Sequence, residues 1–196
     1  MLELRAYHEA GHAVVACLKG FTVTQLTISR HGRIGGACGY QFRRAGRAGL
    51  RRTARAGAAV ALAGSVAQDA AMLERGFLAL DAATGAPFPL FTAGAQDDER
   101  VAMRFAGTLY RGRAARRAFL QRMRASTERL LARPESWAAV RRLAAVLRRE
   151  RTLAGSRAAK GVARAVGHGA RGGGSAARAT ASATSRSIRS QCVPRQ

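Results

Sequence analysis

Several residue types are scarce in this chain of 196 residues, and each scarcity excludes a class of protein. Three cysteines are too few for a disulfide-rich secreted scaffold. No apolar run approaches the roughly 20 residues of a membrane span, and charged residues interrupt the N-terminal segment where a signal peptide would lie. Hydrophobic residues still make up 47% of the chain, as in globular proteins. The composition therefore predicts a folded, cytoplasmic protein without a transmembrane segment.

Acidic residues are scarce as well. Eleven carboxylates face 34 basic residues, which gives a formal net charge of +23. All eleven lie at or before Glu150, whereas residues 151–196 carry nine basic residues and no acid. This Ala, Arg, Gly and Ser-rich segment shows no lasting helical period and predicts a disordered basic tail. The tail could make weak, nonspecific contacts with nucleic acid or acidic surfaces, and a solvated segment of biased composition accounts for the same pattern.

The remaining residues, 1–150, read as one mainly α-helical domain with a small β-hairpin after the first helix. Apolar residues recur at helical spacing in most segments, whereas residues 21–29 alternate, with a slip near Gln25. Residues 34–42 are a second candidate strand, which glycines interrupt. Pro87 and Pro89 require a loop at 84–91. Gly57 and Gly64 predict a break within the Ala-rich segment. The predicted helices are 2–19, 47–75, 97–110, 113–132 and 135–150.

The first predicted helix contains the sequence His-Glu-Ala-Gly-His at residues 8–12. His8 and His12 are four residues apart, so they lie on one helix face and both imidazoles can bind one cation. Zn²⁺ suits neutral histidine ligands and tolerates an open fourth position. Glu9 is offset around the helix, where it can act as general base toward a water activated by the metal. The motif predicts a zinc site with peptidase chemistry rather than an ordinary helix surface.

A third zinc ligand is needed, and the residues alone leave it open. No carboxylate lies between Glu9 and Asp69, which excludes the closely spaced layouts of other zinc peptidases. The acidic cluster at 97–99, after a Gly-containing loop, is the first candidate, and its alternative role is to cap a helix. His31 is the second candidate. The further candidates are Cys17, Cys38, Asp69, Glu74 and Asp81.

Three segments of this chain resemble the FtsH family, the ATP-dependent membrane zinc metalloproteases whose peptidase domain also has free-standing relatives. Residues 6–16 are similar to the zinc-site helix of that family, and residues 62–68 to its small-residue helix, with Gln68 where glutamate is usual. Residues 94–98 resemble a Gly-Ala-x-Asn-Asp segment whose last aspartate is the third zinc ligand. The resemblance covers roughly residues 4–110 and implies a mainly helical peptidase domain in which His8, His12 and Asp98 bind Zn²⁺.

The chain departs from the full-length family because it contains no Walker-type phosphate-binding motif and no membrane anchor. The predicted function is a zinc-dependent metalloendopeptidase that acts on unfolded or flexible polypeptides without ATP, with Glu9 as general base. The alternative is a protein that binds nucleic acid or an acidic partner and whose zinc site is structural or vestigial. The resemblance does not predict an oligomeric state.

Overall fold

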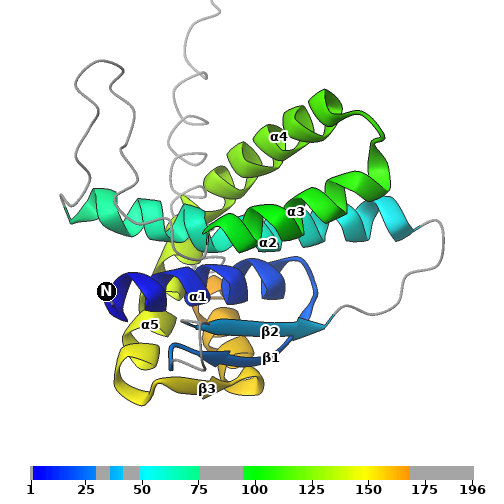
Figure 1. Ribbon diagram of the computed structural model, residues 1–196. Coiled ribbons are helices and arrows are strands. Elements are labelled where there is room, and N and C mark those ends of the chain that lie inside the picture. The colour runs from blue at the N-terminus through cyan, green and yellow to red at the C-terminus, as the bar shows by residue number, and fades with distance from the viewer. Residues whose placement is uncertain (1, 30–35, 42–48, 76–94, 168–196) are drawn as a thin grey trace, which may run out of the picture.

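The computed structural model describes residues 2–29, 36–41, 49–75 and 95–167, and these residues form a mainly helical fold with one small sheet (Figure 1). The predicted fold class is thus confirmed at the level of secondary structure. The predicted loop at 84–91 lies outside the described residues. The elements in chain order are α1 (Leu2–Leu18), β1 (Thr22–Thr27), β2 (Ala37–Gln41), α2 (Leu50–Glu74), α3 (Ala95–Leu109), α4 (Arg113–Leu131), α5 (Pro134–Glu150), β3 (Thr152–Ala154) and a final helix at 155–167.

The predicted hairpin is present. β1 and β2 pair antiparallel, with Leu26 opposite Cys38, and the register shifts between Val23 and Gln25 where the alternation of the sequence slips. β3, which the sequence did not predict, pairs antiparallel with the other side of β1 and completes the order β2-β1-β3. The hairpin therefore becomes the larger part of a three-stranded sheet in which β1 is central.

The predicted domain boundary at residue 150 is wrong. Residues 152–154 form β3, and the helix at 155–167 contributes Ala158, Val162 and Ala165 to the hydrophobic core. A Cβ atom at Gly155 would collide with the backbone carbonyl of Val23, so only glycine lets this segment lie so close to β1. The segment carries few large apolar residues, and it is too short for a strand or helix period to be recognised in its sequence. Residues 168–196 of the predicted tail lie outside the described residues.

α2 is continuous through Gly57 and Gly64, so the predicted break is wrong. Each glycine provides room for a side chain of a neighbouring helix, Phe105 at Gly57 and His8 at Gly64. Within the described part of the chain, α2 is the one helix long and apolar enough to cross a membrane. Its most apolar window is 72% buried inside the fold, as in the core helix of a soluble protein.

The buried residues form two clusters that share α2. The main core lies between α1, the sheet, α5, the helix at 155–167 and one side of α2. The second core lies between α2, α3 and α4, and it is smaller and rich in alanine. Its members are Ala58, Ala61, Leu62, Ala102, Ala106, Phe119 and Leu120.

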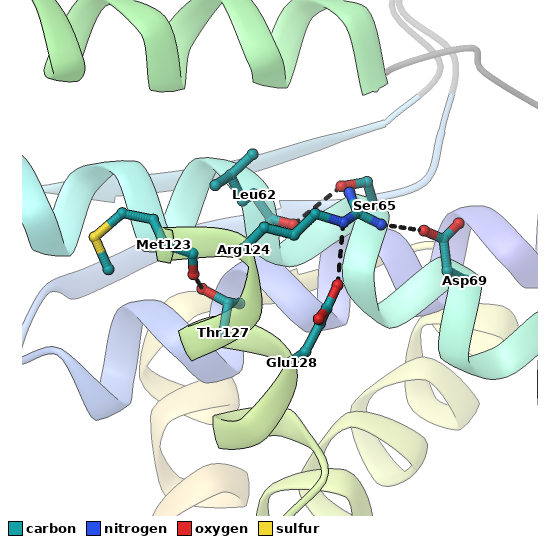
Figure 2. A network of polar contacts seen from close by, with 7 residues as sticks. All are labelled: Leu62, Ser65, Asp69, Met123, Arg124, Thr127 and Glu128. Atoms are coloured by element: carbon teal, nitrogen blue, oxygen red, sulfur yellow. Dashed lines mark hydrogen bonds and ion pairs between the residues drawn. The ribbon is translucent and has the colours of Figure 1, made fainter. Parts of the chain in front are cut away.

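A polar network fixes α4 on α2 beside the second core (Figure 2). Arg124 donates to Asp69 of α2 at 2.6 Å and to Glu128 of its own helix at 3.1 Å. The two carboxylates hold the guanidinium between them, so the rotation of α4 relative to α2 is defined by charge as well as by packing. α2 is thereby placed between α1 on one side and the α3–α4 pair on the other.

Candidate metal centre

The histidine motif of α1 is buried, although it carries three polar side chains. His8, Glu9 and His12 are 7%, 5% and 6% exposed, because α1 is covered by α2 on the side of the histidines and by the sheet on the side of Glu9. The close approach depends on Gly11, where a Cβ atom would lie 2.5 Å from the carbonyl oxygen of Ala63. Buried ionisable groups cost free energy unless they are paired or bind a metal. The motif is therefore not an ordinary helix surface.

Asp98, in the first turn of α3, completes a cluster with the two histidines. Its Oδ2 atom lies 3.0 Å from Nε2 of His8 and 3.3 Å from Nε2 of His12, and the two nitrogens lie 3.2 Å apart. A tetrahedral zinc ion with bonds of about 2.0–2.1 Å spaces its ligand atoms about 3.3 Å apart. The three atoms thus form a triangle of the size that tetrahedral Zn²⁺ requires, and this group could hold a metal ion.

A backbone carbonyl of α2 orients His12 for this role. Nδ1 of His12 lies 2.7 Å from the carbonyl oxygen of Val60, which can only accept, so Nδ1 donates and Nε2 is directed at the cluster. Gly64, one turn further along α2, provides the space. A Cβ atom at Gly64 would lie 2.6 Å from Nε2 of His8 and would also collide with Nε2 of His12. α2 therefore supplies both an orienting acceptor and the room for two imidazoles.

The charges in the cluster fit a cation. Burial alone lowers the pKa of His12, but the adjacent Asp98 carboxylate outweighs it and raises that pKa from 6.5 to about 9. Burial raises the pKa of Asp98, and the two histidines outweigh it and hold that pKa well below its ordinary value. Asp98 Oδ2 is buried and lies close to both histidine nitrogens, but it makes no hydrogen bond of regular geometry. The buried Nδ1 atom of His8 also lacks a hydrogen-bond partner. A metal ion would satisfy that oxygen.

Glu9 lies beside the cluster and not within it. Its carboxylate points toward the start of β2, where a Cβ atom at Gly36 would lie 2.6 Å from Oε1. Burial raises the pKa of Glu9 above 4.5, and the nearby histidines and Arg5 partly offset this rise. Arg5 is one helical turn before Glu9, and its guanidinium reaches the carbonyl of Ile28 at 3.5 Å. Glu9 is therefore buried next to the histidines on α1 without being one of the three atoms of the triangle.

The other candidates for the third ligand are placed differently. Asp97 lies in the first turn of α3 and is directed outward, with its side chain 81% exposed and paired with Arg100. Asp69 pairs with Arg124, and Cys17 and Cys38 are partly buried free thiols outside the cluster. His31 and Asp81 lie outside the described residues, and Glu74 accepts a hydrogen bond from the Trp137 indole.

Sequence reasoning missed the roles of Val60, Gly64 and Gly36 at the site. Every residue has a backbone carbonyl, so the sequence does not indicate that the carbonyl of Val60 orients His12. The two glycines did leave a signal, since each interrupts a segment of regular pattern at some cost in stability. The sequence pattern predicts a helix break at Gly64 and an interruption of the second strand at Gly36, whereas in the structure these glycines face the side chains of His8, His12 and Glu9.

Comparison with known proteins adds no assignment. No model of a known protein family matches the chain, and no curated protein matches it. The resemblance to the FtsH family therefore rests on the three sequence segments alone.

Proposed function

We propose that this protein is a cytoplasmic zinc-dependent metalloendopeptidase that hydrolyses peptide bonds in unfolded or flexible polypeptides. The observation that carries the proposal is the triangle of three ligand atoms, 3.0–3.3 Å apart, beside a buried glutamate that is not part of it. The motif spacing at residues 8–12 and the resemblance to the FtsH family support the same chemistry. The free thiols Cys17 and Cys38 fit a reducing compartment.

In this proposal His8, His12 and Asp98 hold Zn²⁺. Zinc at such a site lowers the pKa of a coordinated water toward about 7 and polarises the carbonyl of the scissile bond. Glu9 takes a proton from the attacking water and delivers it to the nitrogen of the leaving amine, so that one carboxylate serves as base and then as acid. His12 keeps its orientation through Val60, and the packing of α1 on α2 keeps bulk water away from the histidine pair.

The substrate class follows from what the chain carries. The 196 residues contain no Walker-type motif, so they supply no ATP-driven unfolding of a substrate. A peptide bond must be extended and accessible to approach a site in which the candidate ligands are this deeply buried. We therefore expect cleavage of unfolded chains, loops and peptides, and resistance of compact folded proteins.

A single substitution at Glu9 tests the mechanism. Glu9→Gln removes the proton acceptor and keeps the size of the side chain, so zinc should remain at one ion per chain while hydrolysis of casein falls by at least about 100-fold. Zinc is measured by elemental mass spectrometry and cleavage by release of labelled peptides. His12→Ala is the matched variant that should lose both zinc and activity.

Two outcomes would count against the proposal. Equal casein cleavage by the wild type and by Glu9→Gln would show that Glu9 is not the base, or that a contaminating protease is being measured. A wild-type protein that binds zinc at full stoichiometry and cleaves no unfolded substrate would favour the alternative, in which the zinc site is structural.

A further inference from the structure

Six exposed arginines lie in the first two turns of α2 and of α4 and directly after α3. These three helix ends lie at the right of the view in Figure 1. Contacts link the three helices near these ends: Gly57 of α2 faces Phe105 of α3, and the Arg116 guanidinium of α4 donates to the carbonyl of Tyr110 at 2.7 Å. We name this surface the basic pole. Its members are Arg51, Arg52, Arg55, Arg111, Arg113 and Arg117.

The basic pole lacks the neutralising partners that several arginines have elsewhere in the fold. Arg75 and Arg148 both pair with Glu3, and Arg157 pairs with Glu150. Among the described residues, by contrast, no arginine of the pole forms an ion pair or a side-chain hydrogen bond. The sequence explains this, because α2 has no acid before Asp69 and residues 100–127 contain none. Unneutralised like charges at this density repel one another and attract polyanions.

The helix ends add to this potential. α2 and α4 both begin at the basic pole after a glycine, Gly49 and Gly112, and neither has a side-chain cap or an acidic residue in its first turn. The partial positive charge of each helix N-terminus is therefore not offset locally. The positive electrostatic potential of the pole thus comes mainly from the arginine side chains, with a smaller contribution from the N-termini of α2 and α4.

We propose that the basic pole binds the phosphate backbone of double-stranded nucleic acid. The planar guanidinium matches phosphate oxygens in a bidentate way, and arginine supplies every positive side chain here. Exposed aromatic side chains, on which the bases of single strands stack, are missing from the described part of the pole. The pole can therefore contact phosphates but offers no side chains for stacking on bases, so we expect binding that does not depend on the nucleotide sequence.

An anionic membrane is the less suitable partner. A surface that binds lipid needs an apolar face to insert beside its charges. Leu50, 49% exposed, is the one large apolar side chain of the described residues that is exposed at this end. The surface therefore has the charge for electrostatic attraction and lacks the apolar area for insertion.

The test compares two double variants of the full chain that change charge equally. Arg113→Glu/Arg117→Glu reverses two charges of the pole, and glutamate near the start of α4 favours the helix, so the variant should fold. Arg142→Glu/Arg149→Glu reverses two exposed, unpaired arginines of α5, outside the pole. Both keep the basic segment 168–196. Binding is measured by fluorescence anisotropy with a labelled 20-base-pair DNA of mixed sequence, over a series of salt concentrations.

We expect the α4 variant to bind DNA about tenfold more weakly or worse, and its salt slope to fall by roughly two, one for each lost phosphate contact. The α5 variant should stay within about threefold of the wild type, because two distant charges alter only the long-range potential. Both variants should keep the peptidase activity and the unfolding temperature of the wild type.

Three results would overturn the proposal. Equal weakening in both variants would mean that binding follows net charge alone. If the wild-type protein does not bind the DNA even at low salt, the basic pole is not a nucleic-acid binding surface. Tighter binding to vesicles containing phosphatidylserine than to DNA, lost in the α4 variant, would assign the pole to a membrane surface.

Discussion

The two cores of this protein differ in size and in how completely their large side chains are buried, and the candidate metal site lies where they meet. The main core contains large side chains that are fully buried, among them Leu26, Ile28 and Leu147. Both cores are rich in alanine, but the larger residues of the second core, Leu62, Phe119 and Leu120, each keep 3–7% of their surface exposed. The basic pole lies at one end of the second core. His8, Glu9 and His12 belong to α1 of the main core, whereas Asp98 belongs to α3 of the second.

This division has a consequence for the site. α1 and α3 contact α2 from different sides, so the triangle of ligand atoms exists only while both are packed on α2. A metal ion at the triangle would connect the two cores, and free energy of metal binding would then stabilise the docking of α3. The following predictions separate the contributions of the two cores, from the largest effect to the smallest.

Asp98→Ala removes the proposed ligand that the second core contributes. Zinc affinity should fall by more than about 100-fold. Removing a residue that only orients a metal ligand already reduces affinity by up to about 100-fold, and Asp98 would bind the metal directly. The measurement is competition with a chelating dye. Asp97→Ala is the matched control, because Asp97 is directed outward and pairs with Arg100, so its removal should leave affinity within about twofold. Full affinity in Asp98→Ala would place the third ligand elsewhere.

Gly64→Ala should reduce zinc affinity by roughly 10–100-fold, because the added methyl group collides with Nε2 of both histidines and displaces them. The matched control is Gly107→Ala in α3, whose new Cβ would lie no closer than 3.6 Å to the flexible side chain of Arg116. That change should be neutral or stabilise α3 by up to about 1 kcal/mol. If both variants bind zinc as the wild type does, α2 does not shape the site.

The packing of the two cores can be compared through two glycines. Gly11→Ala in the main core would press against the backbone of Ala63, which cannot move aside, and should lower the free energy of unfolding by about 3 kcal/mol. Gly57→Ala in the second core would press against the ring of Phe105, which can shift, and should cost about 1 kcal/mol. Urea denaturation measures both. The reverse order would mean that the second core is the more rigid of the two.

The last prediction concerns pH. In the metal-free protein the His12–Asp98 pair stabilises the fold below pH 6.5, where unfolded histidine is also charged, and this contribution is lost as the pH rises through about 9, the pKa of folded His12. The same pair loses its contribution again in acid, because the lowered pKa of Asp98 makes protonation costly in the fold. Stability measured against pH with a chelator present should therefore decline between pH 6.5 and 9 in the wild type.

His12→Gln should flatten that decline, since the titrating group is gone. Zinc should show the opposite trend, with affinity rising over the same range as the proton leaves His12. A decline of equal size in His12→Gln would assign the pH dependence to another group.

The sequence predicted most helices and the hairpin because these depend on local periodicity. Apolar spacing placed α3, α4 and α5 within two residues of their observed ends, and the slip in the alternation near Gln25 matches the register shift of β1. It failed where glycine or a short segment was interpreted locally. α2 continues through Gly57 and Gly64, and residues 152–167 join the fold, because neighbours distant in sequence fill the space around them.

By itself the sequence determined the part of the candidate site that one helix can carry: His8 and His12 share a face of α1, with Glu9 offset beside them, because a helix repeats every 3.6 residues. It also limited the third ligand to a few residues through the scarcity of carboxylates. Only the tertiary structure decided that Asp98 lies within 3.0–3.3 Å of both histidines, that Val60 orients His12 and that Gly36 faces Glu9. Those contacts join elements far apart in the chain, and packing rather than periodicity brings them together.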